Sequence, residues 1–117
     1  HIPSDGEWQT MEISLGMSES EAASEGWRGS PVANYLKSTY GWNSGGNGSN
    51  SSGFTGLPGG YRYSGGFGNN GYDGYWWSAS ESGSYSWVRL LYFNDDDVFR
   101  YDESLRFNGF SARCVRD

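Results

Sequence analysis

The chain has 117 residues, the length of one domain with a single core of modest size. Its net charge of −6, with dispersed arginines and a single lysine, argues against binding to nucleic acid or to an anionic membrane surface. No apolar run approaches the ~18–20 residues that span a bilayer, and aromatic residues make up 18% of the chain, so we expect a ring-rich folded core without direct membrane insertion.

The first residues carry the signals of a helix. Ser4 and Glu7 form a capping box, in which the serine hydroxyl accepts from one backbone amide and the glutamate carboxylate accepts from another. Three apolar side chains then recur on one helical face: Trp8, Met11 and Leu15. Together these signals predict a helix over residues 5–15 that ends at Gly16.

Two shorter helical segments are expected next. Ser18 and Glu21 repeat the capping box ahead of two alanines and predict a short helical turn. Residues 26–30 contain two glycines and predict a break in the regular structure. Apolar side chains at helical spacing then predict a short helix over residues 31–38.

Residues 41–74 hold most of the 19 glycines and predict long loops, because glycine and asparagine tolerate positive φ angles. Apolar side chains recur through this segment: Trp42, Phe54, Leu57, Tyr61, Tyr63, Phe67 and Tyr72. A loop of this length in a small domain needs anchors. We therefore expect these side chains to fasten the loops to the body of the domain.

The remainder of the chain is predicted to form an antiparallel sheet. Aromatic and β-branched residues favour strands over residues 75–80, 85–94, 98–101 and 109–115, with a turn at Asp95–Asp97. With helices first, loops next and the sheet last, the order of elements is typical of an α+β fold. We expect a single domain over the whole chain.

Trp76 and Trp77 are adjacent on the first of these strands. Neighbouring residues on a strand point to opposite faces of the sheet. We therefore expect one indole to lie in the core and the other to hold loops that pack on the opposite face. A platform for stacking sugars is the alternative interpretation of this pair.

Five stretches carry a resemblance to a known family. They are His-Ile-Pro-Ser-Asp-x-Glu-Trp at 1–8, Leu-Lys-Ser-Thr-x-Gly-Trp at 36–42, Gly-Phe-x-x-Leu-Pro-Gly-Gly-Tyr-Arg at 53–62, Gly-Tyr-Trp-Trp-Ser at 74–78 and Gly-Phe-Ser-x-Arg-Cys-Val-Arg-Asp at 109–117. In this order, over essentially the whole chain, they resemble the Fibrobacter succinogenes major paralogous domain, which is also widespread in Bacteroidetes. The resemblance implies a C-type-lectin-like fold in a secreted or lipid-anchored surface protein.

The same resemblance bears on Cys114, the only cysteine. Family members usually carry Cys-Pro-x-Gly-Trp just before the position of His1. This implies an upstream disulfide partner for Cys114 and a chain that is a fragment of a longer polypeptide, lacking its first strand. A free thiol buried in the last strand is the other interpretation.

Related lectin-like domains are the variable proteins of diversity-generating retroelements in phage and bacteria. Their C-terminal strands and loops carry a hypervariable binding surface. Residues 83–108 are rich in Tyr, Asn, Asp, Ser and Phe, which are residue types that such diversification favours. The resemblance therefore points to the C-terminal strands as a binding surface.

We expect no enzymatic activity, because the sequence shows no nucleophile–base pair and no set of metal ligands. His1, the only histidine, occupies the first position, and the acidic run Asp95–Asp97 is interpreted as a solvated turn. The formylglycine-generating oxidases of this broad fold depend on paired cysteines, whereas this chain has one. No cofactor is expected, although a calcium ion held by Asn43, Asn47 and Asn50 stays open as an alternative.

The strand predicted over residues 85–94 supplies the candidate ligand surface. Trp87, Arg89 and Leu91 share one face, which is assigned to the body because the tryptophan and the arginine recur in the family that the chain resembles. The opposite face and the turn and strand after it are predicted to bind the ligand. The residues are Tyr85, Val88, Leu90, Tyr92, Asn94, Asp96, Phe99, Tyr101 and Phe107.

The resulting hypothesis is a non-enzymatic module, displayed outside the cell, that binds a surface protein or a glycan. A diversified receptor-binding domain is one form of it. The alternative hypothesis is a structural or assembly module in a larger cell-surface protein or phage virion protein.

Overall fold

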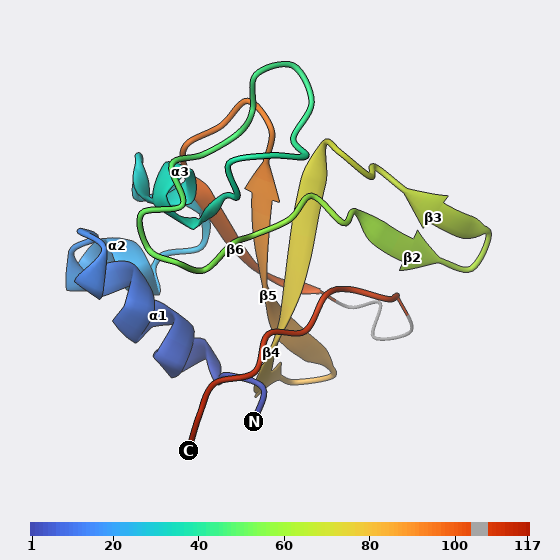
Figure 1. The fold of residues 1–117 in the computed structure, drawn as a ribbon. Coiled ribbons are helices and arrows are strands. Elements are labelled where there is room, and N and C mark those ends of the chain that lie inside the picture. The colour runs from blue at the N-terminus through green and yellow to red at the C-terminus, as the bar shows by residue number, and fades with distance from the viewer. Residues whose placement is uncertain (104–107) are drawn as a thin grey trace.

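The structure, a computed structural model, describes residues 1–103 and 108–117 (Figure 1). Its helices are α1 (Asp5–Ser14), α2 (Glu19–Ala23) and α3 (Val32–Leu36). Its strands are β1 (Gly26–Arg28), β2 (Tyr61–Tyr63), β3 (Gly66–Gly68), β4 (Asp73–Ser82), β5 (Tyr85–Tyr92) and β6 (Val98–Glu103). The helices come first and antiparallel sheets dominate the C-terminal half, so the predicted α+β class is confirmed.

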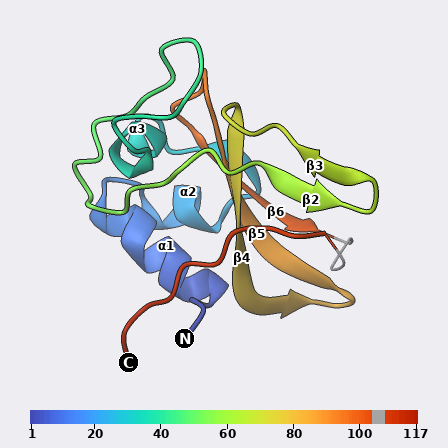
Figure 2. The ribbon, with the colours of Figure 1, turned by 45° about the vertical axis from the view of Figure 1, so that its right-hand side comes forward.

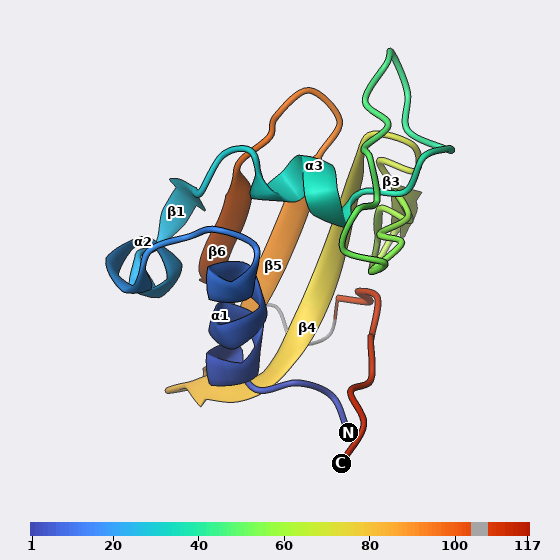
Figure 3. The same cartoon turned by 60° about the vertical axis from the view of Figure 1, so that its left-hand side comes forward.

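The main sheet has four strands in the order β1-β6-β5-β4, and every neighbouring pair is antiparallel. Figure 3 shows α1 and α3 on one face of this sheet. The core lies between helices and sheet and consists of Trp8, Met17, Ala22, Val32, Ala33, Leu36, Trp42, Trp76, Leu91 and Val98. Within the described ranges, no helix has the length and hydropathy that a membrane crossing requires.

Both predicted capping boxes are present and fix where the first two helices begin. The Ser4 hydroxyl accepts from the Glu7 amide at 3.2 Å, and the Glu7 carboxylate accepts from the Ser4 amide at 2.8 Å. Ser18 and Glu21 form the same pair, with both distances 3.1 Å. The first helix ends at Ser14, one residue earlier than predicted.

The prediction of a break at residues 26–30 is wrong for its first three residues, which form β1. They pair antiparallel with β6, and Trp27 lies opposite Phe99. A strand of three residues between glycines is too short to show an alternating pattern. Long-range pairing with β6, rather than local sequence, therefore creates this strand.

The prediction of a strand over residues 109–115 is wrong, since this segment makes only isolated bridges. Gly109 exchanges two backbone hydrogen bonds of 2.8 Å with Arg62 in β2. Ser111 bonds to the backbone of β4 on both sides of Trp76, at 2.9 and 3.1 Å. The C-terminal segment (residues 108–117) thus joins the two sheets, and Figure 2 shows it crossing β4.

The prediction that apolar side chains anchor the long loops is confirmed for some of these side chains. Trp42 is buried, and its indole N–H donates to a backbone carbonyl at 3.0 Å. The Phe54 ring packs edge-on against two core tryptophans, each at 5.6 Å. The prediction is wrong for Phe67, which is 75% exposed on the β2–β3 hairpin. Three other predicted anchors are also exposed: Leu57, Tyr63 and Tyr72.

Candidate functional site

The central strand β5 is buried on both faces of the main sheet. Arg89, which faces the helices, is 1% exposed, and its neighbour Val88, which faces away from them, is 0% exposed. The helices account for the first face only. Other side chains must therefore cover the second face, which we call the outer face.

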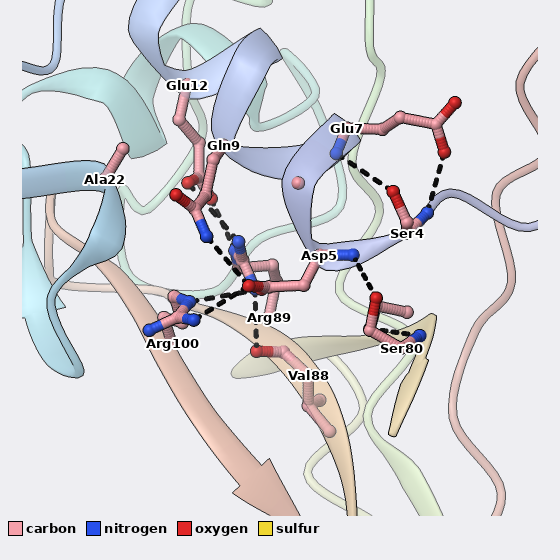
Figure 4. A network of polar contacts seen from close by, with 12 residues as sticks. Ser4, Asp5, Glu7, Gln9, Glu12, Ala22, Ser80, Val88, Arg89 and Arg100 are labelled. Atoms are coloured by element: carbon pink, nitrogen blue, oxygen red, sulfur yellow. Dashed lines mark hydrogen bonds and ion pairs between the residues drawn. The ribbon is translucent and has the colours of Figure 1, made fainter. Parts of the chain in front are cut away.

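The inner face, toward the helices, holds a buried ion network (Figure 4). Asp5 and Glu12 of α1 meet arginines from three strands: Arg28 of β1, Arg89 of β5 and Arg100 of β6. Asp5 lies 2.7 Å from both Arg89 and Arg100, and Glu12 lies 2.6 Å from Arg28. The prediction that Arg89 faces the body of the domain is confirmed.

This network combines three guanidinium groups with two carboxylates, and backbone carbonyls accept further hydrogen bonds from the arginines. Arg28 donates to the Val98 carbonyl at 3.0 Å, and Arg100 donates to the Ala23 carbonyl at 2.8 Å. Burial alone would raise the pKa of Asp5, but its bonds to the arginines lower that pKa to about 2. Since all its groups are buried and paired inside the domain, the network acts as a structural anchor for α1.

Aromatic rings cover the outer face of the sheet. They come from β1, β2, β4, β6 and the C-terminal segment, so distant parts of the sequence meet there. Seven rings form this outer aromatic layer: Trp27, Tyr61, Tyr75, Trp77, Phe99, Tyr101 and Phe110. Six of the side chains are half-buried, and Trp27 is 42% exposed.

Phe110 is the centre of one half of the layer. Its ring stacks on Tyr75 with centroids 4.8 Å apart and planes inclined by 19°, and it lies 4.5 Å from the Trp77 ring. Tyr61 extends the group with its ring 5.4 Å from Tyr75. The prediction from the Trp76–Trp77 pair is confirmed: the first indole is in the core, and the second holds a segment packed on the opposite face.

The other half of the layer runs along β1 and β6. The Trp27 ring lies 4.7 Å from Phe99, and Phe99 lies 5.0 Å from Tyr101. In the sheet register, Val88 pairs with Trp77 on one side and with Tyr101 on the other. Val88, which is 0% exposed, therefore lies in the sheet between the two halves of the layer.

A groove of about 300 Å³ borders this layer where the β2–β3 hairpin meets the C-terminal segment. Tyr61 and Phe110 line it, together with Arg62, Phe67 and Ser111. The guanidinium carbon of Arg62 lies 4.9 Å from the centre of the Phe67 ring. The groove thus combines aromatic side chains, two hydroxyl groups and a cation.

The sequence model of a family described as the Fibrobacter succinogenes major domain matches residues 1–116. The chain belongs to this family. The resemblance inferred from five short motifs is thereby confirmed. No curated protein matches the chain, and no solved structure matches it.

The structure of this major domain corrects part of the predicted ligand surface. Val88 and Leu90 are 0% and 8% exposed, so the described structure does not present their side chains to a ligand. They lie between layer rings of β4 and β6, which cover them. Phe99 and Tyr101 do belong to the layer, whereas Phe107 lies outside the described residues.

The remaining predicted residues of the major domain do not gather at one place. Tyr85 is exposed at the start of β5, and Tyr92 is half-buried at its end. Asn94 and Asp96 are exposed in the loop that follows. Because β5 separates Tyr85 from Asn94, these four residues cannot form a single compact site with one another.

The loop between β5 and β6 is held to the body of the major domain by buried polar contacts. The Lys37 ammonium, which is buried, donates to the Asp95 carbonyl at 2.8 Å, and burial lowers its pKa. The Asp97 carboxylate accepts from the Ser30 amide at 2.8 Å. The turn interpreted as solvated is thus a fixed connection in which one aspartate caps a backbone amide.

Two of the three asparagines considered for calcium, Asn47 and Asn50, hold loop backbone. The Asn47 side-chain oxygen accepts from the Trp42 amide at 3.0 Å, and that of Asn50 accepts from the Thr55 amide at 2.7 Å. Among residues 1–103 and 108–117, no three His, Cys, Asp or Glu side chains cluster in a way that could hold a metal ion. Cys114 is exposed, so the interpretation as a buried thiol is wrong.

Sequence reasoning missed four members of the layer: Trp27, Tyr61, Tyr75 and Phe110. One of them was accessible from the pattern, because Tyr75 alternates with Trp76 and therefore shares a face with Trp77. The other three reach the outer face only through pairing between distant segments. No local signal in the sequence of the major domain reports that pairing.

Proposed function

We propose that this major domain is a non-enzymatic binding module, displayed outside the cell, that recognises a surface protein or a glycan through its outer aromatic layer. The observation that carries the proposal is the layer of seven partly exposed rings, in two groups, on the sheet face opposite α1 and α3. Tryptophan and tyrosine bury much apolar area with few rotatable bonds, and they are enriched in binding hot spots. A contiguous apolar patch on a soluble domain often marks an interaction site.

The architecture supports a C-type-lectin-like fold as part of this proposal. Short helices pack on one side of a small antiparallel sheet, and a long glycine-rich segment connects α3 to β2. The family resemblance implies the same fold and a position at the cell surface. The C-type-lectin-like fold and the position at the cell surface are therefore proposed as expectations from the family.

The only histidine makes contacts that hold the chain together at the surface. His1 lies at the surface, where its ring nitrogens contact the carboxylates of Asp117 at 2.6 Å and Glu7 at 3.0 Å. Hydrogen bonds to Asp117 and to Glu7 raise the pKa of His1. This arrangement pairs the two ends of the described chain and places the imidazole beside two carboxylates.

A binding screen with matched variants tests the proposal. The labelled domain is applied to a glycan array and to intact bacterial and host cells, together with Trp27→Ala, Tyr101→Ala and the control Tyr40→Ala. Tyr40 is 59% exposed in a loop outside the layer. We expect the layer variants to lose binding and Tyr40→Ala to retain it.

Two results would contradict the proposal. One is binding that all three variants retain at the level of the unmodified domain. The other is no binding to any glycan or cell, combined with stable self-association of the domain, which would favour the assembly module instead.

A further inference from the structure

We propose that the groove between the β2–β3 hairpin and the C-terminal segment binds the acidic sugar of a glycan. This inference rests on the proposed function and names its ligand class, because the groove shares Tyr61 and Phe110 with the outer aromatic layer. It assigns the charged part of the ligand to the groove, since the outer aromatic layer alone provides no partner for a charge.

The walls of the groove suit a sugar ring. Tyr61, Phe67 and Phe110 present rings from three separate segments. The face of a sugar carries weakly positive C–H groups, which pack favourably on the negative face of an aromatic ring. Three glycines leave the backbone bare, and the volume of about 300 Å³ is at the lower end of small-ligand sites.

The cation in the groove supplies the charge argument. Among the described residues, the Arg62 guanidinium makes no ion pair and no hydrogen bond. By contrast, each of the three arginines on the inner face has a carboxylate partner. In a chain of net charge −6, an exposed arginine that pairs with none of its many carboxylates is available for an external anion.

The geometry around Arg62 favours a carboxylate as that anion. A guanidinium presents parallel N–H donors that match the two oxygens of a carboxylate. Its contact with the Phe67 ring, at 4.9 Å, restricts its orientation over the groove. This contact also gives a role to Phe67, whose ring is otherwise 75% exposed without packing against the core.

A glycan fits this groove better than an extended peptide. A peptide that binds along a sheet needs a strand with a free edge. β2 pairs with β3 along one edge, and Gly109 takes both backbone hydrogen bonds of Arg62 at the other edge. The hydroxyls of Tyr61 and Ser111 instead offer both donors and acceptors, which match the hydroxyl groups of a sugar.

The test compares two sugars of equal length in calorimetric titrations of the whole chain. Trigalacturonate carries carboxylates, and galactotriose is its neutral counterpart. We expect tighter binding of the acidic trimer and a loss of about tenfold in Arg62→Ala, the scale of one charge-assisted hydrogen bond. Arg116→Ala removes the same charge from an exposed position and should leave the affinity unchanged.

A second variant tests the aromatic wall. Phe67→Ala should weaken binding of both trimers, because it removes a stacking surface that sugars of either charge use. The Phe67 ring is largely exposed, so the melting temperature of the variant should equal that of the unmodified domain. Salt should weaken the binding of trigalacturonate to the unmodified domain more than to Arg62→Ala.

Three results would overturn the inference: unchanged affinity of Arg62→Ala for trigalacturonate, equal affinity for both trimers, or equal binding of a triglutamate peptide. Failure of this inference is distinguishable from failure of the proposed function. If neither trimer binds while binding to cells still depends on Trp27 and Tyr101, the acidic-sugar site is wrong and the binding module stands.

Discussion

The Asp5 carboxylate in α1 accepts two hydrogen bonds from the Arg100 guanidinium in β6, at 2.7 and 3.1 Å, although the residues lie 95 positions apart. Arg100 also lies over the Trp87 ring, 3.9 Å from its centre. The Asp5–Arg100 pair ties the first helix to β6, the last strand of the main sheet. Because both side chains are buried, loss of one partner would leave the other charged group unpaired in the interior.

Asp5→Asn should therefore destabilise the domain strongly. We expect the free energy of unfolding to fall by about 3 kcal/mol, as for other buried ion pairs that lose one partner. Urea denaturation measures this change. Glu25→Gln removes the same charge from an exposed position and should change stability by less than about 0.5 kcal/mol. Equal effects of the two substitutions would contradict the structural role of the network.

The lowered pKa of Asp5 predicts how the stability of the domain depends on pH. The pKa of Asp5 is lowered from 3.8 to about 2 in the folded state. The stabilisation is therefore complete above the unfolded pKa and is lost as the pH falls from about 4 toward 2. The shift corresponds to about 2 kcal/mol. Denaturation at several pH values should show this loss in the unmodified domain and a shallower dependence in Asp5→Asn.

Asp73 predicts a pH dependence of the opposite sign. It is 2% exposed, and burial raises its pKa to about 6 despite hydrogen bonds from Asn69 and Tyr75. Its folded pKa is above its unfolded pKa, so folding favours the protonated acid. Stability should fall as the pH rises from about 4 through about 6, because the buried group becomes charged.

The substitution Asp73→Asn removes this charge and keeps an oxygen that can accept from Asn69. We expect it to raise the free energy of unfolding by about 1–3 kcal/mol at pH 7.5 and to have little effect at pH 4. Denaturation curves at both pH values make the comparison. A stabilisation that is equal at both values would show that ionisation of Asp73 is not the cause.

Val88 supports the outer aromatic layer from beneath, which makes it a stability residue. Val88→Ala should lower the free energy of unfolding by about 2 kcal/mol, because it opens a cavity between Trp77 and Tyr101. Val115→Ala is the matched control, since its side chain is 37% exposed. A cost for Val88→Ala no larger than for the control would mean that the layer does not seal the sheet.

Local sequence signals predicted much of the fold. Ser4 and Ser18 fixed the starts of two helices, because capping boxes act over three residues. Alternation on the strands separated Trp76 from Trp77 and Arg89 from Val88, because the period of two is a property of the backbone. These features depend only on neighbouring residues, so a single sequence is sufficient to find them.

The candidate site could not be predicted to the same extent. Alternation shows that Val88 faces away from Arg89, but it does not show whether that face is open or covered. Phe110, which is more than twenty residues away, stacks on rings of β4 and helps to cover it. The site is assembled by contacts between distant segments, and such contacts leave no periodic trace in the sequence.

The affinity of a double variant in the outer aromatic layer tests the central claim most directly. Trp27→Ala/Tyr101→Ala would be compared with Tyr40→Ala for binding to the array glycans and cells that retain the unmodified domain, after circular dichroism has shown that all three are folded. We predict a loss of at least about tenfold for the double variant and no loss for the control, since aromatic anchors carry most of the energy of an interface. Binding of the folded double variant at the affinity of the unmodified domain would contradict the account.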